Sequence, residues 1–106
     1  MQQRNTGDIA IAKVAFHPPG SDILSLEYTL FQVTGEEGEP LYALRVEKRD
    51  ASSTLLEREE TRGLTGSLED ATVMAKAFAK GTVPPCVLQE MVDEWEHPYS
   101  KTLREA

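Results

Sequence analysis

Two short amphipathic patterns, separated by a glycine and a pair of prolines, limit the fold more than any other feature of the chain. The first follows Ser67, a favourable N-cap residue, and ends near Gly81, a residue type common just after a helix. The second follows Pro84 and Pro85, because a helix start tolerates the missing amide proton. Apolar residues recur three or four positions apart in both: Leu68, Ala71, Ala75 and Phe78, then Leu88, Met91, Val92 and Trp95. Each helix therefore has one apolar side that another element must cover.

The chain before these helices alternates between apolar and polar residues, as strands do when a sheet is covered on one side. The clearest example is 23–33, where Leu24, Leu26, Tyr28 and Leu30 alternate with polar side chains. Further strands are predicted over 8–16, 41–48 and 54–62. The fold class is therefore α+β: a roughly four-stranded antiparallel meander followed by two short helices packed on one face. We expect one domain over 1–106, with flexible or loosely packed ends at 1–7 and 99–106.

Several apolar residues do not fit this alternation. Ile9 and Ile11 fall on the face opposite Val14, and Phe31 and Val33 fall on the polar face of their strand. A bulge near residues 30–31 or partial cover of the second sheet face would explain the second pair. Trp95 ends the second helix beside acidic residues. A partly apolar second face of the sheet and a half-exposed tryptophan indicate a surface that binds a partner. The candidate interaction surface is therefore Ile9, Ile11, Phe31, Val33 and Trp95.

The charge of the chain excludes some classes of partner. The net charge is -7, with 18 acidic and 11 basic residues, so binding to nucleic acid or to an anionic membrane surface is not expected. No apolar run approaches the roughly 20 residues that span a bilayer, and the first residues lack the apolar core of a secretion signal. The single cysteine cannot form an internal disulfide bond, which is typical of a reducing compartment. We expect a cytoplasmic protein.

No arrangement of residues in the chain demands a particular chemistry. Cys86 lies near a helix start, where a thiolate is favoured, but a nucleophile also needs a base, and His17 and His97 are distant in sequence. We expect Cys86 to be a small buried residue, with a reactive thiol as the less favoured alternative. The two histidines have no metal-ligand spacing. We therefore assign no catalytic, cofactor-binding or metal-binding residues.

Three segments resemble a known family. They are Tyr42–Glu47, the link Gly63–Ser67 into the first helix, and Gly81–Trp95, whose Val-Pro step into the second helix is the most distinctive part. In these segments the chain resembles a family of small uncharacterised bacterial proteins, a domain of unknown function with a strand-rich first half and two C-terminal helices. The resemblance implies this fold and a bacterial cytoplasmic origin. It implies no functional residues.

The acidic sequence without motifs favours a non-enzymatic module for protein interaction or structure, acting on a protein partner or associating with itself as a homodimer. The alternative is a domain that binds a small molecule or a peptide in a cleft between sheet and helix near Trp95. An enzyme ranks third, because it would require Cys86 or a glutamate to meet a histidine in a concave site.

Overall fold

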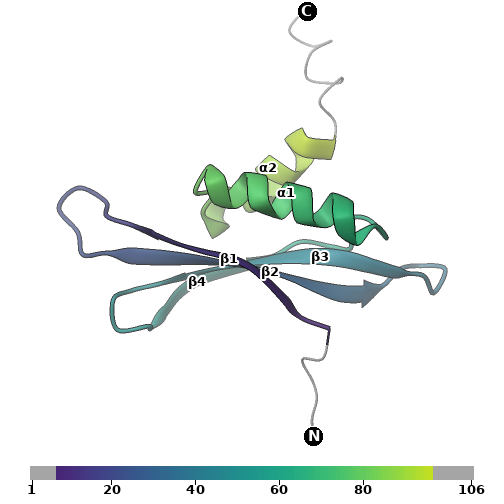
Figure 1. The fold of residues 1–106 in the computed structure, drawn as a ribbon, viewed down its shortest axis with the longest axis horizontal. Coiled ribbons are helices and arrows are strands. Elements are labelled where there is room, and N and C mark those ends of the chain that lie inside the picture. The colour runs from purple at the N-terminus through teal and green to yellow at the C-terminus, as the bar shows by residue number, and fades with distance from the viewer. Residues whose placement is uncertain (1–6, 97–106) are drawn as a thin grey trace, which may run out of the picture.

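The computed structural model describes residues 7–96 and has the predicted α+β architecture. The elements are β1 (Ile9–Phe16), β2 (Leu24–Thr34), β3 (Pro40–Arg49), β4 (Leu55–Glu60), α1 (Leu68–Lys80), a short 3-10 helix η1 (Pro85–Val87) and α2 (Leu88–Glu96). The strands form one antiparallel sheet in the order β1-β2-β3-β4, and both α-helices lie on the same face of it (Figure 1). We call the opposite face the outer face. The loose ends were expected at 1–7 and 99–106, and all of these residues except Gly7 lie outside the described part of the chain.

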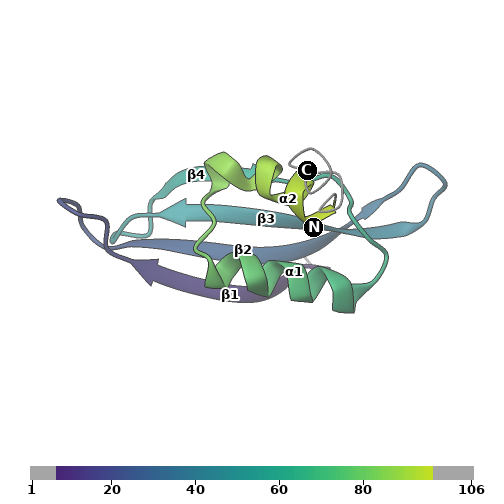
Figure 2. The same ribbon diagram turned by 90° about the horizontal axis from the view of Figure 1, so that it is seen from above.

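The core lies between the sheet and the helices. Seen from above, α1 lies over β1 and β2, while η1 and α2 lie over β3 and β4 (Figure 2). The alternating residues of β2 and β3 supply the sheet side of this core, and the apolar sides of the helices supply the other, as the periodicity predicts. The largest fully buried side chains are Leu26, Tyr28, Leu30, Leu44, Val46, Leu88 and Val92.

A bulge in β1 changes which residues face the helices. Pairing between β1 and β2 shifts register between Ala10 and Ala12, so that Ile9 lies opposite Leu30 and Ala12 opposite Tyr28. Because of the extra residue, odd-numbered Ile9 before the bulge and even-numbered Ala12 and Val14 after it all face the helices. Both Ile9 and Ile11 pack against the core. Their predicted place on the second face of the sheet is wrong, because the prediction assumed strict alternation along the strand and the bulge adds one residue to it.

Phe31 and Val33 do lie on the outer face, as their parity predicts. The register between β2 and β3 runs without interruption from Ser25 to Thr34, so a bulge near residues 30–31 is wrong. The Arg45 guanidinium covers the Phe31 ring, with its central carbon 4.8 Å from the ring centroid. The Phe31 ring on the outer face is thus partly covered by a neighbouring charged side chain.

Both ends of α1 are fixed by local hydrogen bonds. The Ser67 hydroxyl accepts from the Asp70 amide at 3.1 Å, as an N-cap does. At the other end the Val83 amide donates to the Phe78 carbonyl and the Thr82 amide donates to the Ala79 carbonyl. This is a Schellman motif in which Thr82, with φ of 55°, takes the left-handed position that glycine usually occupies. Gly81 is therefore the C-cap residue, one position before the left-handed one.

Tyr28 connects the sheet to the turn between the helices. Its side chain is fully buried, and its hydroxyl donates to the Val83 carbonyl at 2.8 Å. Burial raises the pKa of Tyr28 to about 12. Within residues 7–96, no helix is long and apolar enough to cross a membrane.

Candidate functional site

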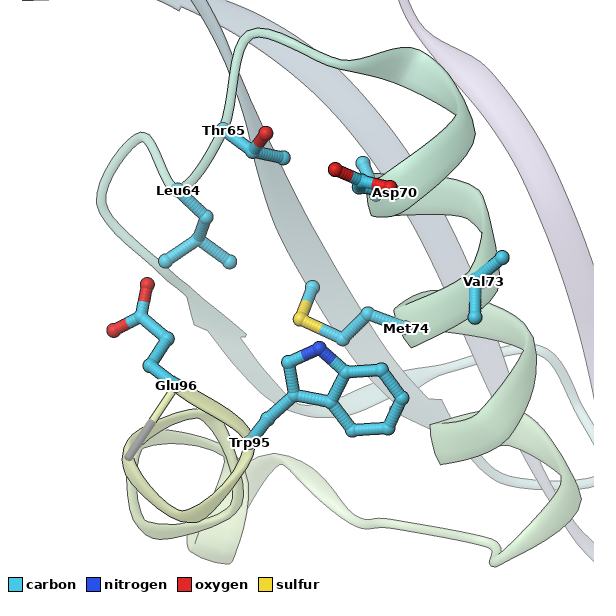
Figure 3. A pocket seen from close by; sticks show the side chains of 8 residues that line it. Leu64, Thr65, Asp70, Val73, Met74, Trp95 and Glu96 are labelled. Carbon is cyan, nitrogen blue, oxygen red and sulfur yellow. The ribbon is translucent and has the colours of Figure 1, made fainter. Parts of the chain in front are cut away.

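A cleft of about 290 Å³ lies between α1 and α2 (Figure 3). The strand-to-helix link supplies one wall, α1 supplies the second, and the last turn of α2 supplies the third. We call it the helix cleft; its lining residues are Leu64, Thr65, Asp70, Ala71, Val73, Met74, Trp95 and Glu96. In the figure the Trp95 indole projects from α2 toward Met74 and Val73 of α1, while Asp70 and Glu96 carry their carboxylates at the rim. The cleft is therefore apolar inside and acidic at its edge.

Trp95 is held in place from one side and open on the other. Its ring meets Phe78 edge to face, with centroids 5.8 Å apart and planes at 87°. The side chain still remains 44% exposed. Val73 and Leu68 of α1 are exposed as well, at 55% and 42%. A fixed aromatic ring beside exposed aliphatic residues is typical of an interaction surface.

The helix that carries Trp95 is strongly acidic. Within its nine residues α2 has four carboxylates, Glu90, Asp93, Glu94 and Glu96, and no basic residue. Three of them, Asp93, Glu94 and Glu96, lie in its last turn, where the helix dipole disfavours negative charge. Glu96 forms an ion pair with Arg62 from the strand-to-helix link. Across residues 67–96 there are six acidic and two basic residues, so the helix layer has an excess of negative charge.

The outer face of the sheet carries a continuous series of ion pairs. Lys13 pairs with Glu27 at 3.9 Å, Glu27 with Arg49 at 3.7 Å, and Arg49 with Glu47 at 3.3 Å. From β3 the series continues to β4, where Glu47 pairs with Arg58 at 3.5 Å and Arg58 with Glu60 at 3.2 Å. It then returns to β3, where Glu60 pairs with Arg45 at 2.7 Å and Arg45 with Asp8 at 3.2 Å. We call these eight residues the ion-pair ladder.

The ion-pair ladder makes the outer face electrically neutral, since four cations alternate with four anions. Hydrogen bonding to Arg45 lowers the pKa of Glu60 below its usual value, against a smaller opposing effect of burial. Single exposed ion pairs contribute little, but a connected network on a sheet holds its side chains in place and opposes pairing with other sheets. The excess negative charge of the molecule therefore lies away from this face.

Within residues 7–96, the remaining predicted residues do not meet to form a reactive site. Cys86 lies in η1 and is exposed, so its expected burial is wrong. It borders a shallow depression with Glu57, Arg58, Glu59 and Pro85, and no described histidine lines this depression. His17 is exposed after β1, and His97 lies outside the described residues. In the described part of the chain, no group of three or more metal-ligating side chains comes together.

The candidate interaction surface predicted from sequence is thus divided among three places. Trp95 lines the helix cleft, Phe31 and Val33 lie on the outer face, and Ile9 and Ile11 pack under the helices. The sequence analysis did not identify Leu64 and Val73, which line the helix cleft together with Trp95. Val73 lies off the apolar stripe of α1, and that departure is the signal that would have found it.

Comparison with known proteins identifies the family but adds no ligand. The model of a family of unknown function, DUF6514, matches residues 20–97, which include β2 through α2. The predicted membership of a family of unknown function is thereby confirmed. The comparison with curated proteins found no match, and the comparison with solved structures found none either.

Proposed function

Because the chain belongs to the DUF6514 family of unknown function, we propose its role from its surfaces: a non-enzymatic protein-interaction module that binds a basic, amphipathic peptide segment in the helix cleft. The observation that carries this proposal is the half-exposed Trp95 beside exposed Val73, in an apolar cleft with carboxylates at its rim. An apolar side chain of the partner enters the cleft, and its basic residues meet Asp70 at the rim and the excess carboxylates of the helix layer.

Charge complementarity supports a basic partner. The helix layer has an excess of carboxylates, whereas the ion-pair ladder leaves the outer face neutral. A cationic segment is therefore attracted to the helix layer in preference to the outer face, and the attraction weakens with added salt. Acidic residues at the C-terminal end of α2 reduce the stability of that helix, so a role in binding accounts for them better than a role in folding.

The size of the cleft favours a peptide over a small molecule. Sites for small molecules usually enclose about 300–1,000 Å³ and bury most of the ligand. The helix cleft, at about 290 Å³, is just below that range and lies open between two helices. It has room for one or two side chains, which a peptide presents while its remaining residues lie across the neighbouring surface.

Trp95 supplies the measurement, because it is the only tryptophan in the chain. Two synthetic peptides with the same apolar residues are titrated into the protein, one carrying lysines and the other glutamates. The lysine peptide is expected to shift Trp95 emission to shorter wavelength, and added salt should weaken its binding. Equal binding of the two peptides, or no change in emission with either, would contradict the proposal.

A matched pair of variants locates the contact. Val73→Asn removes an exposed apolar side chain from the cleft, and Leu56→Asn removes one of similar exposure (47%) from β4, where it does not line the cleft. The first change should weaken the lysine peptide by about fivefold or more, since losing one such contact costs roughly 1 kcal/mol. The second should leave its affinity unchanged.

The setting of this function is part of the same proposal. A cytoplasmic location is supported by Cys86, an exposed lone thiol of the kind that a reducing compartment keeps free. A bacterial origin is supported by the resemblance described from the sequence alone.

A further inference from the structure

The two edges of the sheet differ sharply in chemistry. β1 forms one edge and β4 the other. β1 has one charged residue among eight, Lys13, whereas β4 has four among six. The apolar side chains of β1 that pack on the core remain half-buried, because no described segment pairs with the free side of the strand. An apolar edge strand with unpaired backbone amides and carbonyls readily accepts another strand.

The β4 edge is protected in two ways. Its charged side chains take part in ion pairs, with Arg58 and Glu60 in the ion-pair ladder and Glu57 held by Lys48 at 2.9 Å. In addition, the Gln89 side-chain amide donates to the Glu60 backbone carbonyl at 3.0 Å, which occupies an acceptor on this strand. Of the two edges of the sheet in residues 7–96, β1 is therefore the one that suits a strand of another copy.

We propose that β1 pairs with β1 of a second copy of this chain, in an antiparallel arrangement related by a two-fold axis. This surface is separate from the helix cleft, so the inference does not depend on the proposed function. Pairing of β1 with β4 would continue without end, but the protected β4 edge disfavours it, and two-fold pairing of β1 with itself closes at a dimer. The two four-stranded sheets then form one continuous sheet, with the helices of both copies on the same face.

The residues of β1 favour one register. A two-fold axis at Val14 places Phe16 opposite Ala12 of the second copy, so that a large side chain meets a small one on the helix face. On the outer face the same register places Lys13 opposite Ala15 of the second copy. An axis at Lys13 would instead set two lysines against each other, which is unfavourable. Toward the start of β1, the bulge between Ala10 and Ala12 ends the regular pairing between the two copies.

Charge changes at Ala15 test this register directly. Ala15 is exposed on the outer face, so either charge is tolerated there without loss of the fold, and far-UV circular dichroism checks this. Ala15→Glu faces Lys13 of the second copy and should tighten the dimer, while Ala15→Lys faces the same lysine and should weaken it. Because the symmetry creates each pair twice, the expected change in the dimer dissociation constant is about twofold to thirtyfold in each direction. Sedimentation equilibrium over a dilution series measures this constant.

Ala10 provides the matched control. It is exposed on the same face of the same strand, but its position in the proposed register falls opposite Pro18, beyond the end of β1. Ala10→Glu and Ala10→Lys should therefore have equal dimer dissociation constants. The proposal is overturned if the unaltered protein stays monomeric at every concentration, if the two Ala15 variants dissociate equally, or if the Ala10 pair differs as much as the Ala15 pair.

Discussion

Replacing Tyr28 with phenylalanine removes a single oxygen atom from the centre of the molecule, and its contacts fix the expected effect. The hydroxyl is fully buried and donates to the Val83 carbonyl at 2.8 Å, in the turn that joins α1 to η1. In the variant this carbonyl keeps its place but loses its partner. Leaving a buried acceptor unsatisfied costs about 1–3 kcal/mol, so the free energy of unfolding near neutral pH should fall by that amount. The melting temperature should fall by about 4–8 °C for each kcal/mol.

Alkaline pH should reverse this order of stability. Burial raises the pKa of Tyr28 in the folded protein to about 12, while in the unfolded chain it stays near the usual value of 10.0. The stabilisation is therefore fully present below pH 10 and is lost as the pH rises through about 12. Between these values the wild-type free energy of unfolding falls by about 1.4 kcal/mol for each pH unit through this one residue. The variant has no such residue, so the two stability curves should meet or cross between pH 10 and pH 12.

Urea unfolding followed by far-UV circular dichroism, repeated across this pH range, measures both effects. Tyr42→Phe is the control, because the Tyr42 hydroxyl has no hydrogen-bond partner among residues 7–96, and its stability should track that of the wild type. The reasoning is refuted if Tyr28→Phe is as stable as the wild type at neutral pH. It is also refuted if the difference between them stays constant from pH 10 to pH 12.

Three further changes test other parts of the structure. Thr82→Gly should raise the free energy of unfolding by about 1 kcal/mol in urea titrations, because it relieves a left-handed backbone with φ of 55°. Gly63→Ala should lower it by about 1–3 kcal/mol and lower the melting temperature, since the new Cβ would lie 2.8 Å from the Leu41 Cβ. Glu60→Gln should reduce the loss of stability on acidification, because the Arg45 hydrogen bond lowers the pKa of Glu60 in the folded protein. This carboxylate therefore stabilises the fold fully above its pKa in the unfolded chain. The stabilisation is lost as the pH falls through its pKa in the folded protein. An acid-unfolding curve that is identical with glutamine at this position would show that the ion pair contributes nothing.

The periodicity of the sequence is enough to predict the layers of this fold. The four strands and two helices follow from runs of alternating and helical spacing, each of which points one apolar side toward the core. The exceptions have local causes. Ile9 and Ile11 were assigned to the wrong face because a bulge adds one residue to β1, and no residue type there marks a bulge. Cys86 was expected inside because a lone cysteine is usually a small buried packing residue, yet it lies exposed in η1.

The surfaces were less predictable than the core. Trp95 was recognised because a large aromatic residue at a helix end beside carboxylates is unusual. The other two walls of the helix cleft include Leu64 of the strand-to-helix link and Val73 of α1, which lie far from Trp95 in sequence and come near it only in the folded chain. The ion-pair ladder joins residues from four strands, so its continuity depends on strand register, which alternation alone does not determine.

The strand order has a consequence for how the protein is made. Each strand pairs with its immediate predecessor along the chain, so every hairpin can close by a short loop as soon as its second strand has been synthesised. The helices that cover the sheet come last, because α1 begins only at Leu68. During translation a nearly complete sheet therefore emerges with Leu26, Tyr28 and Leu30 still facing water. A nascent chain arrested at Gly66 is expected to bind a chaperone or to aggregate, and the thirty residues that follow it would act as the cover that keeps the sheet in solution.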